Sequence, residues 1–482
     1  MVVTLNENNK SLAIKAATWT AVGFATSQVL RLGGNLILTR LLAPEAFGLM
    51  SLVAVLMSGL AMFSDLGIGL SVIQSKKGHD SHFLNTAFTL QFVRGLCLAV
   101  ATCILAYPFA HFYGYPILVP LLQVTSLNAI INGLTSTKFW TSNRSLDLGR
   151  LTLIDFSTQI IGLSVMVTWV FVSPGVWGLV AGGIVGSVTK VLCSHVFLAG
   201  LPNRFCWDSS SLREMIHFGR WVFVSTILTF LANQADRLVF GKQISIEMLG
   251  VYANAVIIAG LPVQIILRMG SSVLFPLYSR HINSGKPLRE VFDRVRQPTV
   301  VGGGMSMVWL FGCGPSIVKI LYDERYSAGG WMIQCIVLGA WFTLLSAATG
   351  SAVLASGKPN VIAWCNFGKL IGLLLFIPIG FWIGDFQGAL IGIVFAEAMK
   401  YVILGMGVRS CGLSVFHHDF TMTSYVVILG LFALWIASWM EHLNSGPVPI
   451  LSVIAMVAIV PWLPFIYPIW KDLRTFRQDA SE

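Results

Sequence analysis

The chain has 482 residues, of which 55% are hydrophobic, 12% are aromatic and only 11% are charged. Soluble domains carry about 25% charged residues, so this composition excludes a soluble globular enzyme, and the aromatic content excludes a disordered chain. The apolar residues form continuous runs instead of alternating with polar ones, which excludes an outer-membrane barrel.

Fourteen apolar runs, separated by proline, glycine and charged residues, predict fourteen transmembrane helices of about 20 residues or more. In chain order they cover residues 16–40, 48–72, 83–109, 116–137, 150–172, 176–199, 217–240, 249–277, 297–320, 329–355, 360–383, 386–408, 421–440 and 448–470. The sequence therefore predicts an all-α membrane protein with an even number of spans.

The distribution of basic residues predicts the orientation of these helices. If the N-terminus is cytoplasmic, twenty Lys and Arg residues lie in inner segments, whereas the outer segments hold only Arg40, Lys242, Lys319 and Arg325. Cytoplasmic loops of membrane proteins are enriched in Lys and Arg, so both termini are expected in the cytoplasm. The same loops account for the net charge of +10, and we expect no nucleic-acid partner.

Two segments of the chain resemble each other at an offset of 202 residues. Residues 36–48 parallel residues 238–250, with Arg40 matching Lys242, Glu45 matching Glu247 and Gly48 matching Gly250. One such match could be coincidence in an apolar chain, but the offset also equals six predicted helices. A duplicated six-helix unit would give two lobes related by an axis along the membrane normal.

The repeat predicts the domain organisation. We expect an N-terminal six-helix lobe over residues 1–203 and a C-terminal six-helix lobe over residues 204–412. Residues 413–482 then form an appended pair, helices 13 and 14, with a cytoplasmic tail.

Polar residues lie in two predicted helices on a single face each. The first helix carries Gln28, Arg31 and Asn35, and the eighth carries Gln264 and Arg268. Neither arginine has an acidic residue within one turn. A charge at the centre of a membrane helix costs roughly 3 kcal/mol, so each arginine needs a partner from another helix or a water-filled cavity.

Other ionisable residues fall within or at the ends of the predicted helices. Arg94 lies midway along the third, and Lys369 lies in the inner half of the eleventh. The acidic residues Asp65, Asp236 and Glu397 are interpreted either as ion-coupling residues or as members of ion pairs within the lobes. For Arg31, Arg94 and Arg268, cavity-lining function and buried structural pairing are both open. Arginine in a watered cavity suits an anion, because its planar group binds phosphate bidentately.

The sequence contains no recognisable catalytic or metal-binding pattern. The eight cysteines have no ligand spacing, and no nucleophile–base pair or phosphate-binding glycine loop is found. We therefore expect a protein that is not an enzyme, with no catalytic residue, no metal and no cofactor.

Three stretches carry a family resemblance, namely Thr39–Met50 (TRLLAPEAFGLM), Ser64–Lys76 (SDLGIGLSVIQSK) and Gln234–Lys242 (QADRLVFGK). They resemble the polysaccharide transport family, the Wzx-type lipid-linked oligosaccharide flippases of the multidrug/oligosaccharidyl-lipid/polysaccharide exporter superfamily. The exopolysaccharide and colanic-acid-like branch is the most similar. The motifs are loose and mark architecture more than substrate.

The resemblance implies a multi-pass protein of the bacterial inner membrane that works by alternating access. Its expected substrate is an undecaprenyl-pyrophosphate-linked oligosaccharide, moved from the cytoplasmic to the periplasmic leaflet for exopolysaccharide or O-antigen-type biosynthesis. Its expected partners are this substrate, membrane lipids and the polymerase and export machinery of the pathway. Basic residues near the start of each lobe contact the pyrophosphate in related flippases. The corresponding cavity residues here are Arg31, Arg268, Arg94, Gln28, Asn35, Gln264 and Lys369.

Two other classes of protein remain as alternatives. A multidrug and toxin extrusion-type antiporter has the same superfamily fold, but a carrier of organic cations should prefer carboxylates in its cavity. A membrane enzyme of polysaccharide assembly would be expected to have a large outer loop, and all predicted outer loops are short.

Overall fold

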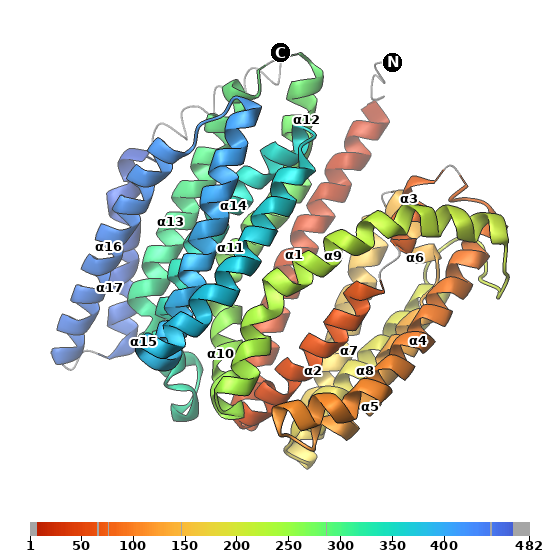
Figure 1. The fold of residues 1–482 in the computed structure, drawn as a ribbon, viewed down its shortest axis with the longest axis horizontal. Helices are drawn as coiled ribbons and strands as arrows, with labels where there is room; N and C mark the ends of the chain where they lie inside the picture. The colour runs from red at the N-terminus through yellow and green to blue at the C-terminus, as the bar shows by residue number, and fades with distance from the viewer. Residues whose placement is uncertain are drawn as a thin grey trace. The chain divides into compact units, whose positions relative to one another are not determined.

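The computed structural model describes residues 7–64, 67–75, 77–145, 147–285, 287–443 and 446–465. Within these ranges all regular secondary structure is helical (Figure 1). Ten helical elements of the described residues are long and apolar enough to cross a membrane when Pro359–Cys411 is counted once. An eleventh crossing is added if the bent pair α5 (Leu118–Gly133) and α6 (Lys138–Arg144) is one span. The all-α membrane fold is confirmed, whereas the predicted count of fourteen is larger than the ten or eleven spans found in the described residues.

The described residues form two compact units. Unit 1 comprises those up to Phe230 together with Arg237–Gly250, and unit 2 comprises Leu231–Asp236 together with those from Val251 onward.

Unit 1 holds the N-terminal helices. They are α1 (Glu7–Leu41), α2 (Pro44–Phe63), α3 (Ile68–Gln74), α4 (Ser81–Tyr113), α5 (Leu118–Gly133), α6 (Lys138–Arg144), α7 (Leu148–Val172), α8 (Val176–Val196), most of α9 (Ser209–Gln243) and the start of α10 (Ile246–Ala259). The start of α2 follows from its local sequence, because Pro44 occupies the first position of the helix, where its missing N–H is not needed.

The start of α9 is fixed by an aspartate cap. The Asp208 carboxylate accepts hydrogen bonds from the backbone N–H of Ser211 at 2.8 Å and from the hydroxyls of Ser210 and Ser211. These bonds, led by the Ser211 hydroxyl, hold the pKa of Asp208 well below its usual range.

The two repeated segments meet in unit 1, where the first turns of α2 and α10 cross. A Cβ atom added to Gly48 would lie 2.0 Å from the carbonyl oxygen of Ile246, and one added to Gly250 would lie 1.8 Å from that of Pro44. Gly48 and Gly250 are 202 residues apart, and so are Pro44 and Ile246. This is the offset between the repeated segments, so the two contacts are equivalent. Only glycine permits this approach of two backbones.

A bulky residue at this crossing should prevent folding. We expect Gly48→Leu and Gly250→Leu to reduce sharply the amount of folded protein, because overpacking costs about 1–3 kcal/mol even where side chains can move, and here the neighbour is backbone. Gly183→Leu is the matched control, since a Cβ at this α8 glycine meets nothing within 4 Å. Size-exclusion chromatography of solubilised membranes measures the yield of folded protein. Equal yields of all three variants would contradict the close contact between α2 and α10.

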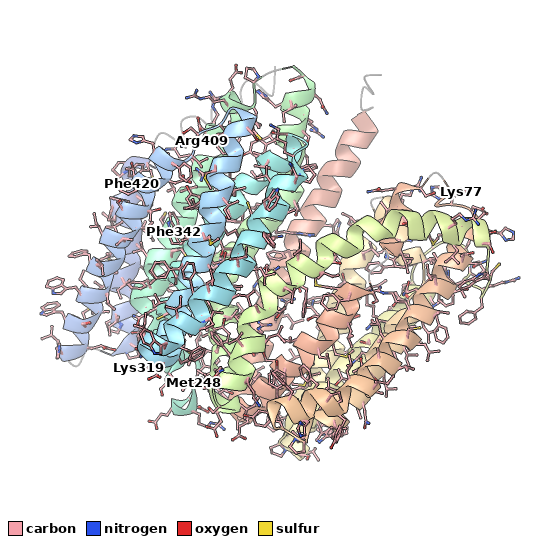
Figure 2. The ribbon with its side chains drawn as sticks, in the orientation of Figure 1. Lys77, Met248, Lys319, Phe342, Arg409 and Phe420 are labelled. Carbon is pink, nitrogen blue, oxygen red and sulfur yellow. The ribbon has the colours of Figure 1, made fainter. Side chains whose placement is uncertain are left out.

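Unit 2 holds the remaining helices. They are α11 (Leu261–Met269), the π-helical turn η1 (Gly270–Leu274), α12 (Phe275–Asn283), α13 (Leu288–Leu321), the short turn η2 (Glu324–Tyr326), α14 (Gly329–Ala355), α15 (Pro359–Val408), η3 (Arg409–Cys411), α16 (Phe416–His442), α17 (Pro447–Ile459) and η4 (Val460–Trp462). Arg409 and Lys319 lie at opposite ends of this unit (Figure 2).

The long element α15 is two helices. Gly384 and Asp385 have non-helical dihedral angles, with φ of Asp385 at 49°. After this break the chain turns back on itself, because Cβ atoms at Gly380 and Gly388 would each lie within 2.2 Å of the other residue's carbonyl oxygen. The sequence prediction of separate helices over 360–383 and 386–408 is confirmed.

A buried polar network joins four helices of unit 2. The Arg296 guanidinium on α13 donates to both carboxylate oxygens of Asp419 on α16, at 2.7 and 2.5 Å. It also donates to the Thr349 hydroxyl on α14, and the Tyr401 hydroxyl on α15 donates to Asp419 at 2.6 Å. Arg296 and Asp419 are only 3% and 1% exposed. The network therefore ties α16, part of the predicted appended pair, to the helices before it.

Candidate functional site

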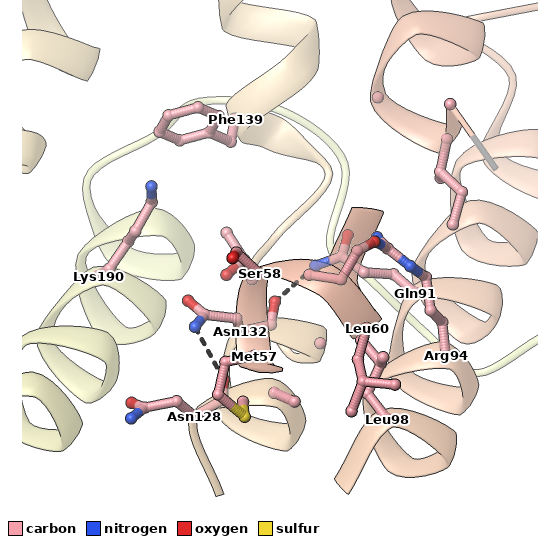
Figure 3. Close-up of a pocket in the computed structure, with 18 of the residues that line it drawn as sticks. Met57, Ser58, Leu60, Gln91, Arg94, Leu98, Asn128, Asn132, Phe139 and Lys190 are labelled. Carbon is pink, nitrogen blue, oxygen red and sulfur yellow. Dashed lines mark hydrogen bonds between the residues drawn. The ribbon is translucent and has the colours of Figure 1, made fainter. Parts of the chain in front are cut away.

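A cavity of about 740 Å³ lies within unit 1, among α2, α3, α4, α5, α6 and α8 (Figure 3). Its polar lining consists of two cationic residues, amides and hydroxyls, contributed by Ser58, Gln91, Arg94, Thr102, Asn128, Asn132, Thr135 and Lys190. None of the described residues that line it is acidic. We call it the unit 1 cavity.

Arg94 is half-buried in the wall of this cavity and is held by the end of α2. Its Nε donates to the Ser64 hydroxyl at 3.0 Å, and its Nη2 donates to the carbonyl oxygen of Ala61 at 2.6 Å. The last carbonyls of a helix lack partners within the helix and carry partial negative charge. Arg94 therefore both stabilises the end of α2 and brings a positive charge to the cavity.

Lys190 supplies the second cation from α8. Its Nζ lies 3.6 Å from a carboxylate oxygen of Asp155 and 4.8 Å from the centre of the Phe139 ring. Figure 3 shows Lys190 and Arg94 on opposite sides of the cavity, with Asn132 between them. A bound anion could thus be contacted by positive groups from two sides.

Amides line the wall between the two cations. Gln91 on α4 donates to the carbonyl oxygen of Asn132 at 2.6 Å, and Asn132 on α5 donates to the carbonyl oxygen of Asn128 at 2.8 Å. Amide side chains offer donors and acceptors together, which matches the hydroxyl groups of a sugar. The sequence prediction included Arg94 but missed Lys190 and the asparagines. The spacing of Gln91 and Arg94, and of Asn128 and Asn132, on one helix face each was the available signal.

A smaller cavity of about 250 Å³ lies within unit 2 and gathers four of the predicted residues, Asp236, Gln264, Lys369 and Glu397. Lys369 Nζ lies 2.6 Å from Glu397 Oε1, and both residues are buried. The Tyr252 hydroxyl donates to Asp236 at 2.6 Å. Lys369 was expected to bind phosphate, but its ammonium group is already paired with Glu397.

The two arginines at the centre of the sequence prediction lie elsewhere. Arg31 on α1 in unit 1 and Arg268 on α11 in unit 2 are exposed, and neither lines the cavities described above. Among the described residues, neither guanidinium forms a hydrogen bond or ion pair. Gln28 and Asn35 are half-buried on α1 and have polar contacts of their own. Asp65 lies outside the described residues.

The comparison with known families decides the identity of the chain. Residues 37–328, more than half of the sequence, match the family described as polysaccharide biosynthesis proteins. The chain belongs to this family. The resemblance to polysaccharide transporters that its motifs indicated is thereby confirmed.

Individual relatives agree with this membership. The succinoglycan biosynthesis transport protein ExoT of Rhizobium meliloti is 21% identical over 426 residues, which cover 88% of this chain and 86% of ExoT. Among solved structures, the lipid II flippase MurJ in its inward closed conformation has a TM-score of 0.72 at 14% identity, covering 94% of this chain and 99% of MurJ.

An inward-facing multidrug resistance MATE transporter of the MOP superfamily has a TM-score of 0.64 at 14% identity, covering 80% of this chain and 95% of that one. The two structures establish the transporter fold of a multi-pass membrane protein. Fold alone does not separate a flippase from a cation antiporter, so the chemistry of the cavities must do so.

Proposed function

We propose that this protein is a flippase that moves undecaprenyl-pyrophosphate-linked oligosaccharide repeat units from the cytoplasmic to the periplasmic leaflet of the bacterial inner membrane. The observation that carries the proposal is the unit 1 cavity, in which Arg94 and Lys190 flank a wall of amides and no described lining residue is acidic. Cationic groups bind pyrophosphate through charge-assisted hydrogen bonds, and amides bind sugar hydroxyls.

The proposed architecture has fourteen crossings in two six-helix lobes, residues 1–203 and 204–412, followed by the helix pair of residues 413–482. Both termini lie in the cytoplasm. The equivalent contacts of Gly48 and Gly250 support the duplication, and the opposite placement of Arg409 and Lys319 in unit 2 fits one inner and one outer segment.

Transport in this proposal proceeds by alternating access, with the lobes rocking about the bound head group. The lobes then present Arg31 and Arg268 to the pyrophosphate. We assign ion coupling to the unit 2 cavity, because protonation of Glu397 would break its pair with Lys369 and leave a buried charge that must find a new partner.

The cation-antiporter alternative rests on the two carboxylates of the unit 2 cavity. Lys369 already neutralises Glu397, and Asp236 accepts a hydrogen bond from Tyr252. The larger unit 1 cavity would repel an organic cation. The charges that line the two cavities therefore favour an anionic substrate.

Deletion of the gene in its host tests the function. We expect lipid-linked repeat units to accumulate in the cytoplasmic leaflet, where periplasmic enzymes cannot reach them, and export to return with the wild-type gene. Unchanged export together with increased sensitivity to cationic drugs would instead identify a multidrug antiporter.

The arginines outside the cavities give a second test. We expect Arg31→Ala and Arg268→Ala each to reduce export by about tenfold or more, because a hydrogen bond between charged groups contributes about 1.5–3 kcal/mol. Lysine at either position should restore export only partly, since the planar group is lost. Immunoblots of the membrane fraction provide the control, and normal export from variants of normal abundance would remove both residues from the site.

A further inference from the structure

Two short helices, α3 and α6, line one end of the unit 1 cavity. The chain bends by 58° between α5 and α6, and after this bend Phe139 and Trp140 of α6 lie in the cavity wall. Lys190 lies at the same end, away from Arg94, with its Nζ 4.8 Å from the centre of the Phe139 ring (Figure 3). We call this region the α6 end of the cavity.

The Trp140 indole is held in place on one side and lines the cavity on the other. It packs against the buried apolar cluster formed by α3 and the start of α4. A Cβ added to Gly69 would lie 2.6 Å from the indole Nε1, so glycine at this position makes room for the ring. Trp140 is nevertheless only half-buried. It therefore offers a fixed aromatic surface to a ligand in the cavity.

The amide wall between the two cations contains acceptors without donors. The oxygens Gln91 Oε1 and Asn128 Oδ1 are buried, and neither has a hydrogen-bond partner among the described residues. Buried polar atoms normally have partners, so these oxygens point to a ligand that brings donors. A phosphate oxygen without a proton cannot donate, whereas a sugar hydroxyl can.

The aromatic residues at the α6 end do not suit an organic cation. The Lys190 ammonium group already lies over the Phe139 ring, where it uses the negative face of that ring and repels a second cation. An aromatic surface beside amide acceptors is instead complementary to a pyranose ring. The faces of such a ring carry apolar C–H groups, and its edge carries hydroxyls.

We propose that the α6 end of the unit 1 cavity is a sugar subsite, which binds the pyranose joined to the pyrophosphate. The Trp140 indole packs against one face of this ring, and the amide oxygens of Gln91 and Asn128 accept hydrogen bonds from its hydroxyls. The inference rests on the proposed function, since the sugar belongs to the transported repeat unit. The cavity volume of about 740 Å³ lies in the range of roughly 300–1,000 Å³ that small-molecule sites have.

Binding of short-chain substrate analogues to the purified full-length protein in detergent tests the stacking contact. Isothermal titration calorimetry compares citronellyl pyrophosphate with the same molecule carrying glucose or galactose on its terminal phosphate. We expect the wild type to bind a glycosylated analogue more tightly, and Trp140→Ala to weaken only that analogue, by about tenfold. Trp140→Phe should retain part of the gain, because an aromatic surface remains. Trp177→Ala is the matched control, since Trp177 is a partly exposed tryptophan of α8 that does not line the cavity.

Replacement of Asn128 by leucine separates sugar recognition from folding. The buried oxygen of this side chain lacks a donor, so Asn128→Leu should match or exceed the thermal stability of the wild type. The same variant should weaken the glycosylated analogue several-fold and leave citronellyl pyrophosphate binding unchanged. A purely structural role predicts the opposite, namely lower stability with unchanged binding of both analogues. This variant decides the case if Trp140→Ala fails to fold.

Equal effects of Trp140→Ala and Asn128→Leu on both analogues would overturn the proposal. Binding of tetraphenylphosphonium that depends on Trp140 would also overturn it, by identifying a cation site. Tight binding of citronellyl pyrophosphate with no gain from either sugar would refute the subsite and leave the pyrophosphate site in place. A sugar gain that depends on Trp140, in a protein whose deletion leaves export intact, would support the subsite while refuting the proposed function. The two claims therefore fail separately.

Discussion

Cells that carry the double variant Arg94→Ala, Lys190→Ala should lose polysaccharide export while retaining the protein in the membrane. Each cation contributes a hydrogen bond between charged groups, at about 1.5–3 kcal/mol, so removal of both should lower affinity for the head group by about 10²–10⁴-fold. Export of labelled polysaccharide and immunoblots of the same membranes measure the two quantities.

The single variants separate binding from folding. Arg94 also stabilises the end of α2, so Arg94→Ala carries a structural cost, whereas the contact of Lys190 with Asp155 is long and partly exposed. Lys190→Ala should therefore reduce export about tenfold at normal abundance. Arg150→Ala is a suitable control, because Arg150 forms an exposed pair with Asp147 away from the cavity. Normal export from Lys190→Ala would exclude this residue from the site.

Removal of either partner of the buried pair between Arg296 and Asp419 should strongly destabilise the protein. Breaking a buried ion pair leaves an uncompensated charge and costs about 3–5 kcal/mol, so Arg296→Ala and Asp419→Ala should yield little folded protein. Thermal unfolding of purified protein measures whatever remains. The double variant Arg296→Met, Asp419→Leu should recover much of the loss, because apolar residues can replace a buried pair.

An exposed ion pair of the same unit provides the comparison. Lys319 and Glu441 lie 2.8 Å apart with 61% and 43% of their side chains exposed, so Lys319→Ala should cost no more than about 1 kcal/mol. If the Arg296 and Asp419 variants were as stable as Lys319→Ala, the network would not hold α16 in place.

The helical fold could be predicted because the apolar runs are long and their interruptions are local. The break between the two halves of α15 coincides with Gly384 and Asp385, residues that disfavour a continuing helix. The number of crossings was harder to predict. Helices α1 and α9 combine apolar and charged turns, and the ten spans counted among the described residues do not include them.

Partners distant in sequence could not be predicted. Arg296 is one of the twenty basic residues that the predicted topology places in inner segments, yet it is buried against Asp419, 123 residues away. Glu397 lies 2.6 Å from Lys369 of the antiparallel half of α15, a partner that the sequence of its own helix does not reveal. Hydropathy and spacing report on one helix at a time, whereas these pairs depend on which helices are neighbours. The transport roles of Arg31 and Arg268 remain predictions for the same reason.

The crossing of α2 and α10 constrains how the two halves of this chain could diverge after a duplication. At an ordinary contact, a larger residue on one side can be compensated by a smaller one opposite. At Gly48 and Gly250 the opposite atom is a carbonyl oxygen, which no substitution can remove. If the two halves arose by duplication, the copies can drift apart in sequence elsewhere, but each must keep its glycine for as long as the other copy is packed against it.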